Sequence, residues 1–421
     1  MSGGVTGLRT NQTTARGGAG SVAASLDELA RIGATADGGV TRVAWSPELF
    51  RAYDVVAGWM RELGLEVEVD PAGNLLGRWE AGSGAPVLVG SHLDTVPSGG
   101  RFDGALGVVA AVHAVRLLKE EGFEPGRPLW VVAFMDEEGT RFDAALFGSR
   151  AFTGEDVTRL GDRVDAAGTT LRDAMAAAGY DAAVAGGASR IADVGAYLEL
   201  HIEQGPVLES EGLDIGVVTS IVGLRGFRVR LEGTANHAGT TPMALRRDAF
   251  VGAARIALAL RDEARAREGV TANVGRIAVE PGGANVVPGV ADFTIDVRSA
   301  TPAGIAELER LVEETVARIA AEEGLRADVR QTFALEPLEL DAQLVDAVER
   351  AAVAERAGVR RMPSGAGHDA MLVGRHVPAA MIFVPSRGGV SHSPDEHSTP
   401  EQVELGMRVL AGVLRESLRT E

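Results

Sequence analysis

An uninterrupted apolar run at residues 129–135 constrains the fold more than any other stretch of the 421-residue sequence. Apolar side chains on both faces are typical of a central strand in a parallel sheet, because helices cover both sides of such a strand. A second buried strand is expected at 87–89, and a strongly apolar helix at 103–119 separates the two. The order strand, helix, strand predicts an α/β fold whose functional residues lie beyond the carboxyl ends of the strands.

Both expected strands are followed by side chains that can bind metal ions. The first leads into a Gly-rich loop with His92, Asp94 and Asp103, and the second leads into Glu137 and Glu138. Each motif alone has an ordinary interpretation. The first could be a polar turn that faces solvent, and the second an acidic helix N-terminus stabilised by the helix dipole.

The composition limits the chemistry and the partners of this chain. It contains no cysteine, so disulfides and thiolate ligands are excluded, and any metal ion must be held by His, Asp and Glu. A cytoplasmic location is the expectation for such a chain, and residues 1–20, which lack the apolar core of a signal peptide, are expected to form a loose tail. The net charge of −18 argues against nucleic-acid binding. The sequence contains no run of about 18 apolar residues, so no membrane span is expected.

The hydrophobic pattern changes in the middle of the chain, and this change predicts an inserted domain. Its strands alternate apolar and polar residues, as strands with one buried and one wet face do. Strands and helices are expected in the order β-α-β-β-α-β of a ferredoxin-like domain, at 227–231, 247–267, 270–279, 290–298, 302–319 and 326–332. We therefore expect a small domain at 217–335, inserted into a larger mixed-sheet α/β domain formed by 21–216 and 336–421.

Histidines close behind expected strands of the larger domain strengthen the case for a metal site. Together with two carboxylates they suit a pair of divalent ions such as zinc, manganese or cobalt. A carboxylate that bridges two ions about 3.5–4 Å apart is the usual arrangement of two-metal hydrolases, and it lowers the pKa of a bridging water. Glu137 is the candidate general base for that water. The candidate ligands are His92, Asp103, Glu138, His201 and His392.

Several motifs, taken in order along the chain, resemble the M20 family of dinuclear metallohydrolases. The blocks EEGTRF and LHIEQGP are similar to the hydantoinase/carbamoylase branch, which includes N-carbamoyl-L-amino acid hydrolases, β-ureidopropionases and allantoate amidohydrolases. The resemblance covers the chain from about residue 25 onward. The motifs are SHLDTVP at 91–97, RFDG at 101–104, EEGTRF at 137–142, LHIEQGP at 200–206, NHAGTTPM at 236–243, GAGHDA at 365–370 and VSHSPDE at 390–396.

For the larger domain, the resemblance implies two metal sites that share one carboxylate. One ion would be bound by His92, Asp103 and His201. The other would be bound by Asp103, Glu138 and His392. Asp103 is therefore the most informative residue of the set, because it would have to touch both ions.

The resemblance also implies roles for residues that do not bind metal. Asp94 would orient His92, and Glu137 would act as the catalytic acid and base. In the inserted domain, His237 would stabilise the tetrahedral intermediate and Asn285 would bind substrate. The inserted domain would also serve as a lid and as a dimer interface, which implies a homodimer.

Further candidates for substrate binding come from both domains. The resemblance assigns Arg298 to the substrate, and a bidentate guanidinium suits a carboxylate. A surface salt bridge from Arg298 to Asp296 or Glu232 is the alternative. Gln204 and His368 are candidates either for contact with a ureido group or for shaping the pocket.

The predicted reaction is hydrolysis of the carbamoyl group of an N-carbamoyl-L-amino acid, which gives the amino acid, carbon dioxide and ammonia. Allantoate amidohydrolase and β-ureidopropionase are alternatives, because allantoate also pairs a ureido group with a carboxylate. An M20 aminopeptidase or acylase is a more distant alternative. Candidates for every ligand and for the base argue against a catalytically inactive scaffold on this fold. His397 is expected behind the ligands or on the surface, and His376 on the surface.

Overall fold

The computed structural model describes residues 20–419, so nearly all of the expected tail lies outside the described residues. A nine-stranded mixed sheet has the order β1-β2-β4-β3-β5-β15-β6-β13, with β14 paired to β6. Its centre is parallel and completely buried, and consists of β3 (Val87–His92), β4 (Leu129–Phe134), β5 (Ala196–Ile202) and β15 (Ala379–Val384). The mixed sheet and the buried strands of the prediction are thus confirmed. The edges are β1 (Glu66–Val69), β2 (Leu75–Trp79), β6 (Ile215–Ile221), β13 (Leu338–Glu339) and β14 (Val359–Ser364).

Helices cover this sheet because their apolar faces need a partner. The apolar helix expected after the first motif is α3 (Ala105–Glu120), which packs on β3 and β5. It also contacts α1 (Val22–Ala30) and α12 (Pro400–Ser417). The remaining helical segments around this sheet are α2 (Pro47–Glu62), α4 (Phe147–Phe152), η1 (Thr158–Asp162), α5 (Leu171–Ala177), α6 (Ala182–Ala185), η2 (Ile191–Asp193), α7 (Val207–Glu211), α10 (Ala342–Ala354), α11 (Ala370–Val373) and η4 (Arg387–Gly389).

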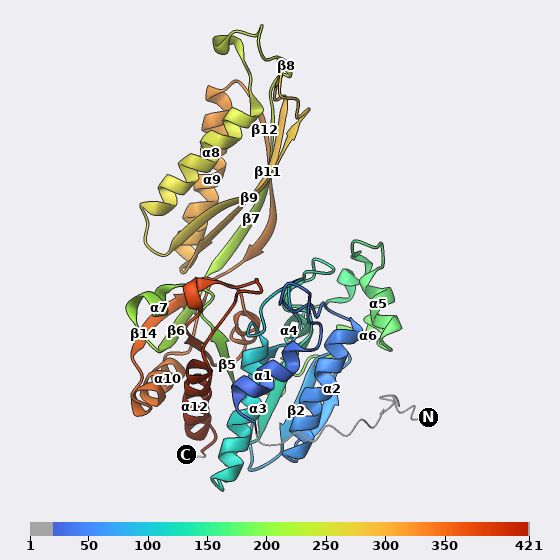
Figure 1. Cartoon of the computed structure of the whole chain (residues 1–421), viewed down its shortest axis with the longest axis vertical. Coiled ribbons are helices and arrows are strands. Elements are labelled where there is room, and N and C mark those ends of the chain that lie inside the picture. The colour runs from blue at the N-terminus through green and yellow to red at the C-terminus, as the bar shows by residue number, and fades with distance from the viewer. Residues whose placement is uncertain (1–19, 420–421) are drawn as a thin grey trace.

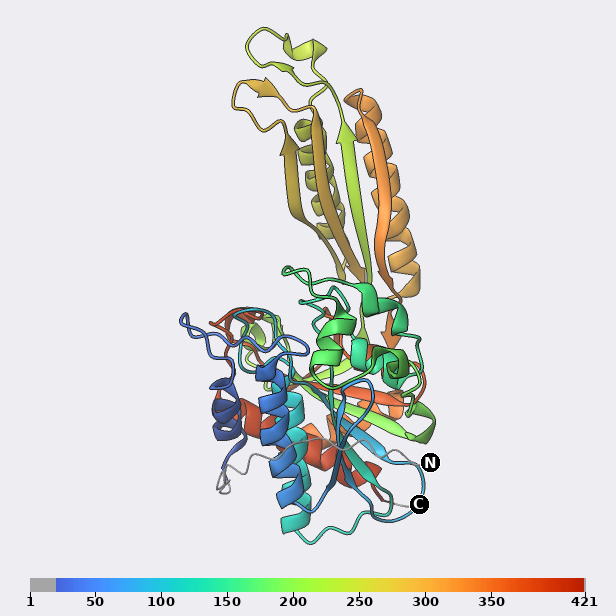
Figure 2. The same cartoon turned by 90° about the vertical axis from the view of Figure 1, so that its right-hand side faces the viewer.

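A second, four-stranded sheet is antiparallel and has the order β12-β7-β11-β9. It stands at one end of an elongated molecule (Figures 1 and 2). The alternation expected along its strands is observed, since Ala291, Phe293, Ile295 and Val297 are buried in a core of their own. Its elements are β7 (Gly223–Glu232), α8 (Ala249–Arg265), β9 (Val270–Glu280), β11 (Val290–Ser299), α9 (Pro302–Glu322) and β12 (Arg326–Leu335).

The chain enters and leaves the four-stranded sheet at neighbouring points. Gly223 begins β7 directly after β6, and Leu335 ends β12 just before β13. Leu335 pairs with Leu224 across the two strands. At the far end, β8 (Asn236–His237) pairs with β10 (Val286–Val287) in a small two-stranded antiparallel sheet, and η3 (Met243–Leu245) follows β8 (Figure 1).

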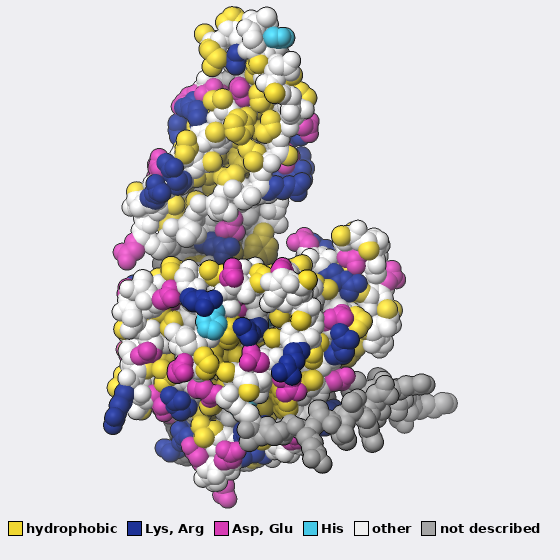
Figure 3. Space-filling view, in the orientation of Figure 1, with side chains coloured by type: hydrophobic (Ala, Val, Ile, Leu, Met, Phe, Trp, Pro, Cys, Tyr) yellow, Lys and Arg dark blue, Asp and Glu magenta, His cyan; other side chains and the backbone are white. Residues whose placement is uncertain are grey.

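The helical side of the four-stranded sheet leaves apolar surface exposed to solvent. Phe250, Val251 and Leu258 of α8 are each at least 40% exposed. Figure 3 shows hydrophobic side chains gathered over this part of the molecule. Within residues 20–419, no helix is both long enough and apolar enough to cross a membrane.

Candidate metal centre

A cavity of about 200 Å³ lies beyond the carboxyl ends of the central parallel strands. This is the position that an open α/β sheet offers to a ligand. Side chains of both sheets line it, so the cavity lies between them. The lining from the large sheet includes the predicted ligands and Glu137, and the four-stranded sheet contributes Leu224, Arg298, Phe333 and Leu335.

Two buried histidines point the same ring nitrogen into the centre. His92 ends β3, and its Nδ1 lies 3.0 Å from the carbonyl oxygen of Asp94. His201 lies in β5, and its Nδ1 lies 2.9 Å from the carbonyl oxygen of Ile202. A carbonyl oxygen can only accept, so Nδ1 carries a proton in both rings, and each neutral ring would present the lone pair of Nε2 to the centre. This is how a metal-binding histidine is oriented.

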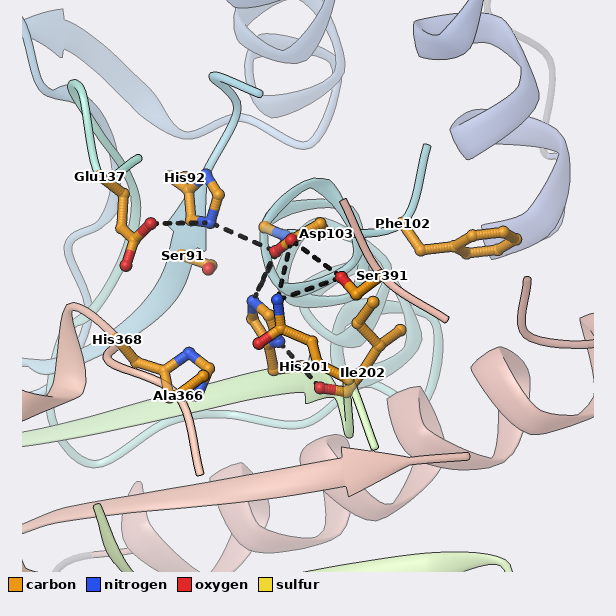
Figure 4. Close-up of polar contacts among 12 residues, drawn as sticks. Ser91, His92, Phe102, Asp103, Glu137, His201, Ile202, Ala366, His368 and Ser391 are labelled. Carbon is orange, nitrogen blue, oxygen red and sulfur yellow. Dashed lines mark hydrogen bonds and ion pairs between the residues drawn. The ribbon is translucent and has the colours of Figure 1, made fainter. Parts of the chain in front are cut away.

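Asp103 lies between the two halves of the centre (Figure 4). Its Oδ1 is 3.1 Å from His201 Nε2 and 3.7 Å from His92 Nε2. Its Oδ2 is 3.2 Å from His392 Nε2. The two oxygens of one carboxylate therefore face different histidines, as a bridging ligand requires.

The predicted ligands form two compact groups that share Asp103. Potential ligand atoms of His92, Asp103 and His201 all lie within 4.8 Å of one another, and so do those of Asp103, Glu138 and His392. The turn that delivers Asp103 depends on the next residue. Gly104 has φ +64°, and a Cβ there would overlap the ring of His92. Glycine is therefore required on both counts.

Asp94 holds the second strand-end motif in place. Its carboxylate accepts hydrogen bonds from the backbone N–H groups of Glu137, at 3.2 Å, and Glu138, at 3.1 Å. Its backbone carbonyl orients His92, while its Oδ1 lies 3.6 Å from His92 Nδ1. One residue thus positions both a predicted ligand and the predicted base.

Burial and mutual repulsion disfavour the charged forms of the acids in the centre. Burial, reinforced by the charges of Glu138 and Asp369, raises the pKa of Glu137 well above its usual range. Burial, reinforced by Asp103, raises the pKa of Glu138 to about 8. Glu138 Oε1 is buried and has no hydrogen-bond partner among residues 20–419. Cations would favour the charged forms, so the donor set fits divalent metal ions.

The histidines respond to the same acidic surroundings. The hydrogen bond with Asp103 raises the pKa of His392 to about 9. Burial lowers the pKa of His201, but Asp103 outweighs this effect and brings it to about 9. Protons and metal ions therefore compete for these nitrogens, and metal binding would release protons.

Gln204 and His368 both line the cavity. Gln204 Nε2 donates to Asp103 Oδ2, at 2.9 Å, and to Ser391 Oγ, at 3.2 Å. His368 is buried, its Nε2 lies 2.8 Å from Ser364 Oγ, and its ring lies 4.5 Å from that of His201. Burial lowers the pKa of His368 well below its usual value, so its ring is neutral.

Arg298 reaches the cavity from β11. Its Nε donates to Asp296 Oδ1 at 2.8 Å, which is one of the ion pairs considered as the alternative to substrate binding. Its Nη1 also donates to the carbonyl oxygen of Gly365 at 2.8 Å, so the guanidinium links β11 to the loop that follows β14. The structure shows the ion pair with Asp296 and places Arg298 at the cavity, and substrate binding by Arg298 stays a prediction.

The structure does not bring His237 and Asn285 to the cavity of the same chain. Both lie at the far end of the four-stranded sheet, where β8 pairs with β10, and both are exposed. His237 Nδ1 accepts a hydrogen bond from the N–H of Gly239 at 3.0 Å, which leaves Nε2 free. Of the histidines without an assigned role, His376 is exposed, and His397 packs edge-on against Phe102.

Sequence reasoning overlooked a buried glutamate beside the ligands. Glu199 accepts hydrogen bonds from Ser91 Oγ at 2.7 Å, Tyr197 Oη at 3.1 Å and the N–H of Ala370 at 3.1 Å. It also forms a potential ligand group with His201 and His368. A charged residue two positions before a ligand, inside an apolar strand, was a usable signal because both side chains share one face.

The centre places a buried acid beside two groups of potential ligands, each made of histidines and carboxylates, at the strand ends of a mixed α/β sheet. This is the arrangement of a metal-dependent hydrolase. Residues 88–416 match the model of peptidase family M20/M25/M40, and this chain belongs to that family.

Relatives of known name agree with this assignment. An N-carbamoyl-L-amino-acid amidohydrolase of Paenarthrobacter aurescens is 41% identical over 398 residues, which cover 93% of this chain and 96% of that protein. An allantoate amidohydrolase of Bacillus subtilis is 40% identical over 398 residues, with coverage of 92% and 95%. A hydantoinase/carbamoylase family amidase of Burkholderia multivorans has a crystal structure that matches with a TM-score of 0.88 and 38% identity, covering 94% of this chain and 97% of that one. The predicted family and the predicted class, a hydrolase of C–N bonds, are confirmed.

Proposed function

We propose that this protein hydrolyses the ureido group of N-carbamoyl-L-amino acids with the help of two divalent metal ions. The placement of Asp103 carries the proposal, because its two oxygens face two separate His and carboxylate groups. The relatives support the substrate class, since N-carbamoyl-L-amino-acid amidohydrolases are among the similar proteins.

The chain's own residues would orient the reaction and move its proton. His92, His201 and Asp103 would hold one ion, and Asp103, Glu138 and His392 the other. Zinc, manganese or cobalt ions in these places would polarise the ureido carbonyl and supply a nucleophilic water. Glu137 lines the cavity with Oε2 3.7 Å from His92 Nε2. It would accept the proton of the attacking water and return it to the departing nitrogen, and its raised pKa favours that second step.

The substrate can be identified by one assay. Metal-loaded protein is incubated with N-carbamoyl-α-amino acids, N-carbamoyl-β-alanine, allantoate and a dipeptide, and the released ammonia or amino acid is measured. We expect ammonia from the N-carbamoyl-α-amino acids, and none after the protein has been treated with a chelator. Release from allantoate alone would favour the second candidate, which the Bacillus subtilis relative supports. Cleavage of the dipeptide alone would contradict both.

We expect Arg298→Lys to raise KM for substrates with a carboxylate by about 10–100-fold, with a smaller effect on kcat. A charge-assisted hydrogen bond contributes about 1.5–3 kcal/mol, and lysine cannot form the bidentate pair. Steady-state kinetics give both constants. Arg228→Lys is the matched control, because the exposed side chain of Arg228 on β7 forms an ion pair with Asp292 on the neighbouring β11, outside the cavity. Equal effects of the two substitutions would refute the role of Arg298.

We propose a two-part organisation for the chain. Residues 223–335 would be a ferredoxin-like lid and dimerisation domain, and 21–222 with 336–421 the catalytic domain. The expected start at 217 falls inside β6, which is a strand of the nine-stranded sheet. The separate core of the four-stranded sheet and its β-α-β-β-α-β order support this division. A second copy would explain the remote position of His237 and Asn285, because these residues can meet a substrate only if another subunit presents its cavity to them. A cytoplasmic location stays a prediction.

The exposed apolar side of α8 is the proposed contact between the two copies. We expect Leu258→Glu to convert a dimer into a monomer, because it places a charge among Phe250 and Val251. Sedimentation velocity measures the state, and kcat should fall with it. Val353→Glu is the control, since this residue is equally exposed on α10, next to the nine-stranded sheet. A wild-type protein that sediments as a monomer would contradict the proposal.

A further inference from the structure

Glu396 connects two loops that lie 294 residues apart in the sequence. It is only 3% exposed and belongs to the segment between β15 and α12. Its Oε1 accepts the N–H groups of Phe102, at 3.0 Å, and Asp103, at 3.1 Å. Its Oε2 accepts the hydroxyl of Ser391, at 2.9 Å.

The two loops carry the shared carboxylate and the last histidine of the centre. Asp103 itself donates its N–H group to Glu396, and Ser391 directly precedes His392. We propose that Glu396 is a positioning residue that fixes Asp103 relative to His392 for metal binding. This inference rests on the proposed two-metal function, because it concerns how those ligands are held.

The hydrogen bonds around Ser391 explain how Glu396 would affect the carboxylate of Asp103. The hydroxyl of Ser391 lies 2.9 Å from Glu396 Oε2 and 3.3 Å from Asp103 Oδ2. It has one proton, so it can donate to only one of these carboxylates. The shorter distance favours Glu396, while Gln204 Nε2 donates to Asp103 Oδ2 at 2.9 Å. Glu396 thus draws the Ser391 proton away and leaves Asp103 Oδ2 a lone pair toward His392 (Figure 4 shows Ser391 beside Asp103).

The neighbouring backbone is shaped to admit this carboxylate. A Cβ at Gly100 would overlap Glu396 Oε1 and its carboxyl carbon. Gly100 does not have a positive φ, so a side chain there is excluded by space and not by backbone strain. Gly100→Ala therefore offers a second way to displace the carboxylate, with Glu396 itself intact.

Glu396→Gln separates the positioning role from simple packing. The amide oxygen can still accept the two backbone N–H groups, but the amide nitrogen donates to Ser391 and redirects the hydroxyl proton toward Asp103. We expect affinity for Co²⁺ to fall by about 10–100-fold, the range for residues that support a ligand. Titration of metal-free protein with Co²⁺ against a chromophoric chelator, read by the visible absorption of bound Co²⁺, measures this. The melting temperature of the metal-free protein should change little.

Two further variants make the test decisive. Gly100→Ala should lower Co²⁺ affinity as Glu396→Gln does, and the double variant should lose little more, because both act on one contact. Asp341→Asn is the control. Asp341 also accepts two backbone N–H groups at 3.0 Å, but it caps α10 beside the opposite end of β15. Its variant should bind Co²⁺ like the wild type.

The outcomes distinguish this inference from the function on which it rests. Wild-type protein that binds no Co²⁺ would refute the proposed metal centre. Wild-type protein that binds two ions, with Glu396→Gln binding them equally well, would refute the positioning role alone. An equal loss of affinity in Asp341→Asn would show that the effect is a general loss of stability, and would also refute it.

Discussion

Glu137→Gln is expected to lower kcat by about 10²–10⁴-fold, the usual contribution of a general acid–base group. Glutamine has the shape of glutamate but cannot accept the proton of water. The backbone N–H of residue 137 would still donate to Asp94, so the motif should keep its position. The affinity for metal should therefore stay as in the wild type, and KM should change little. Stopped-assay kinetics together with metal analysis of the same sample measure both quantities.

The adjacent residue provides the control for this prediction. Glu138→Gln removes a proposed ligand, whose Oε2 lies 3.6 Å from His392 Nε2, and should release one ion. The two neighbouring substitutions should thus fail differently, one in proton transfer and the other in metal content. Full activity of Glu137→Gln with both ions bound would refute the mechanism.

Asp103→Ala is expected to remove both metal ions and all measurable turnover. The loss should exceed the effect of about 10–100-fold that is typical of a supporting residue, because this carboxylate belongs to both ligand groups. Dialysed protein analysed for zinc, manganese and cobalt gives the stoichiometry. Circular dichroism would show whether the nine-stranded sheet is retained.

A comparison with His201→Ala makes this prediction specific. His201 belongs to the group with His92 and Asp103 but not to the group of Asp103, Glu138 and His392. Its variant should therefore keep the ion between Glu138 and His392. If Asp103→Ala still bound two ions, or lost only one, Asp103 would not be the shared ligand.

The central strands and the ends at which chemistry occurs could be predicted because they depend on local patterns. An uninterrupted apolar run marks β4, and a polar residue that directly follows such a run must lie at the end of the strand. Parallel strands bring these ends together, so the strand order alone predicts that His92, His201 and Glu137 lie close to one another. The alternation in β11 predicted its buried face for the same reason.

What could not be predicted depends on contacts between distant segments or on the backbone. The motif suggested that Asp94 orients His92, but not that a carbonyl does so while the carboxylate holds Glu137. The contacts of Glu396 could not be predicted, because Phe102 and Asp103 lie far from it in the sequence. The position of His237 depends on the length and direction of the long strands, which periodicity does not give.

The proposed ligands of the centre are spread from residue 92 to residue 392, and this spread has a consequence for biosynthesis. A ribosome makes the amino-terminal segment first, and domains begin to fold while synthesis continues. The proposed ligands Asp103 and Glu138 are made 289 and 254 residues before His392, which would complete their site. The proposed second metal site can be completed only after His392 has been made. An ion in that site would therefore stabilise only polypeptides that extend beyond His392.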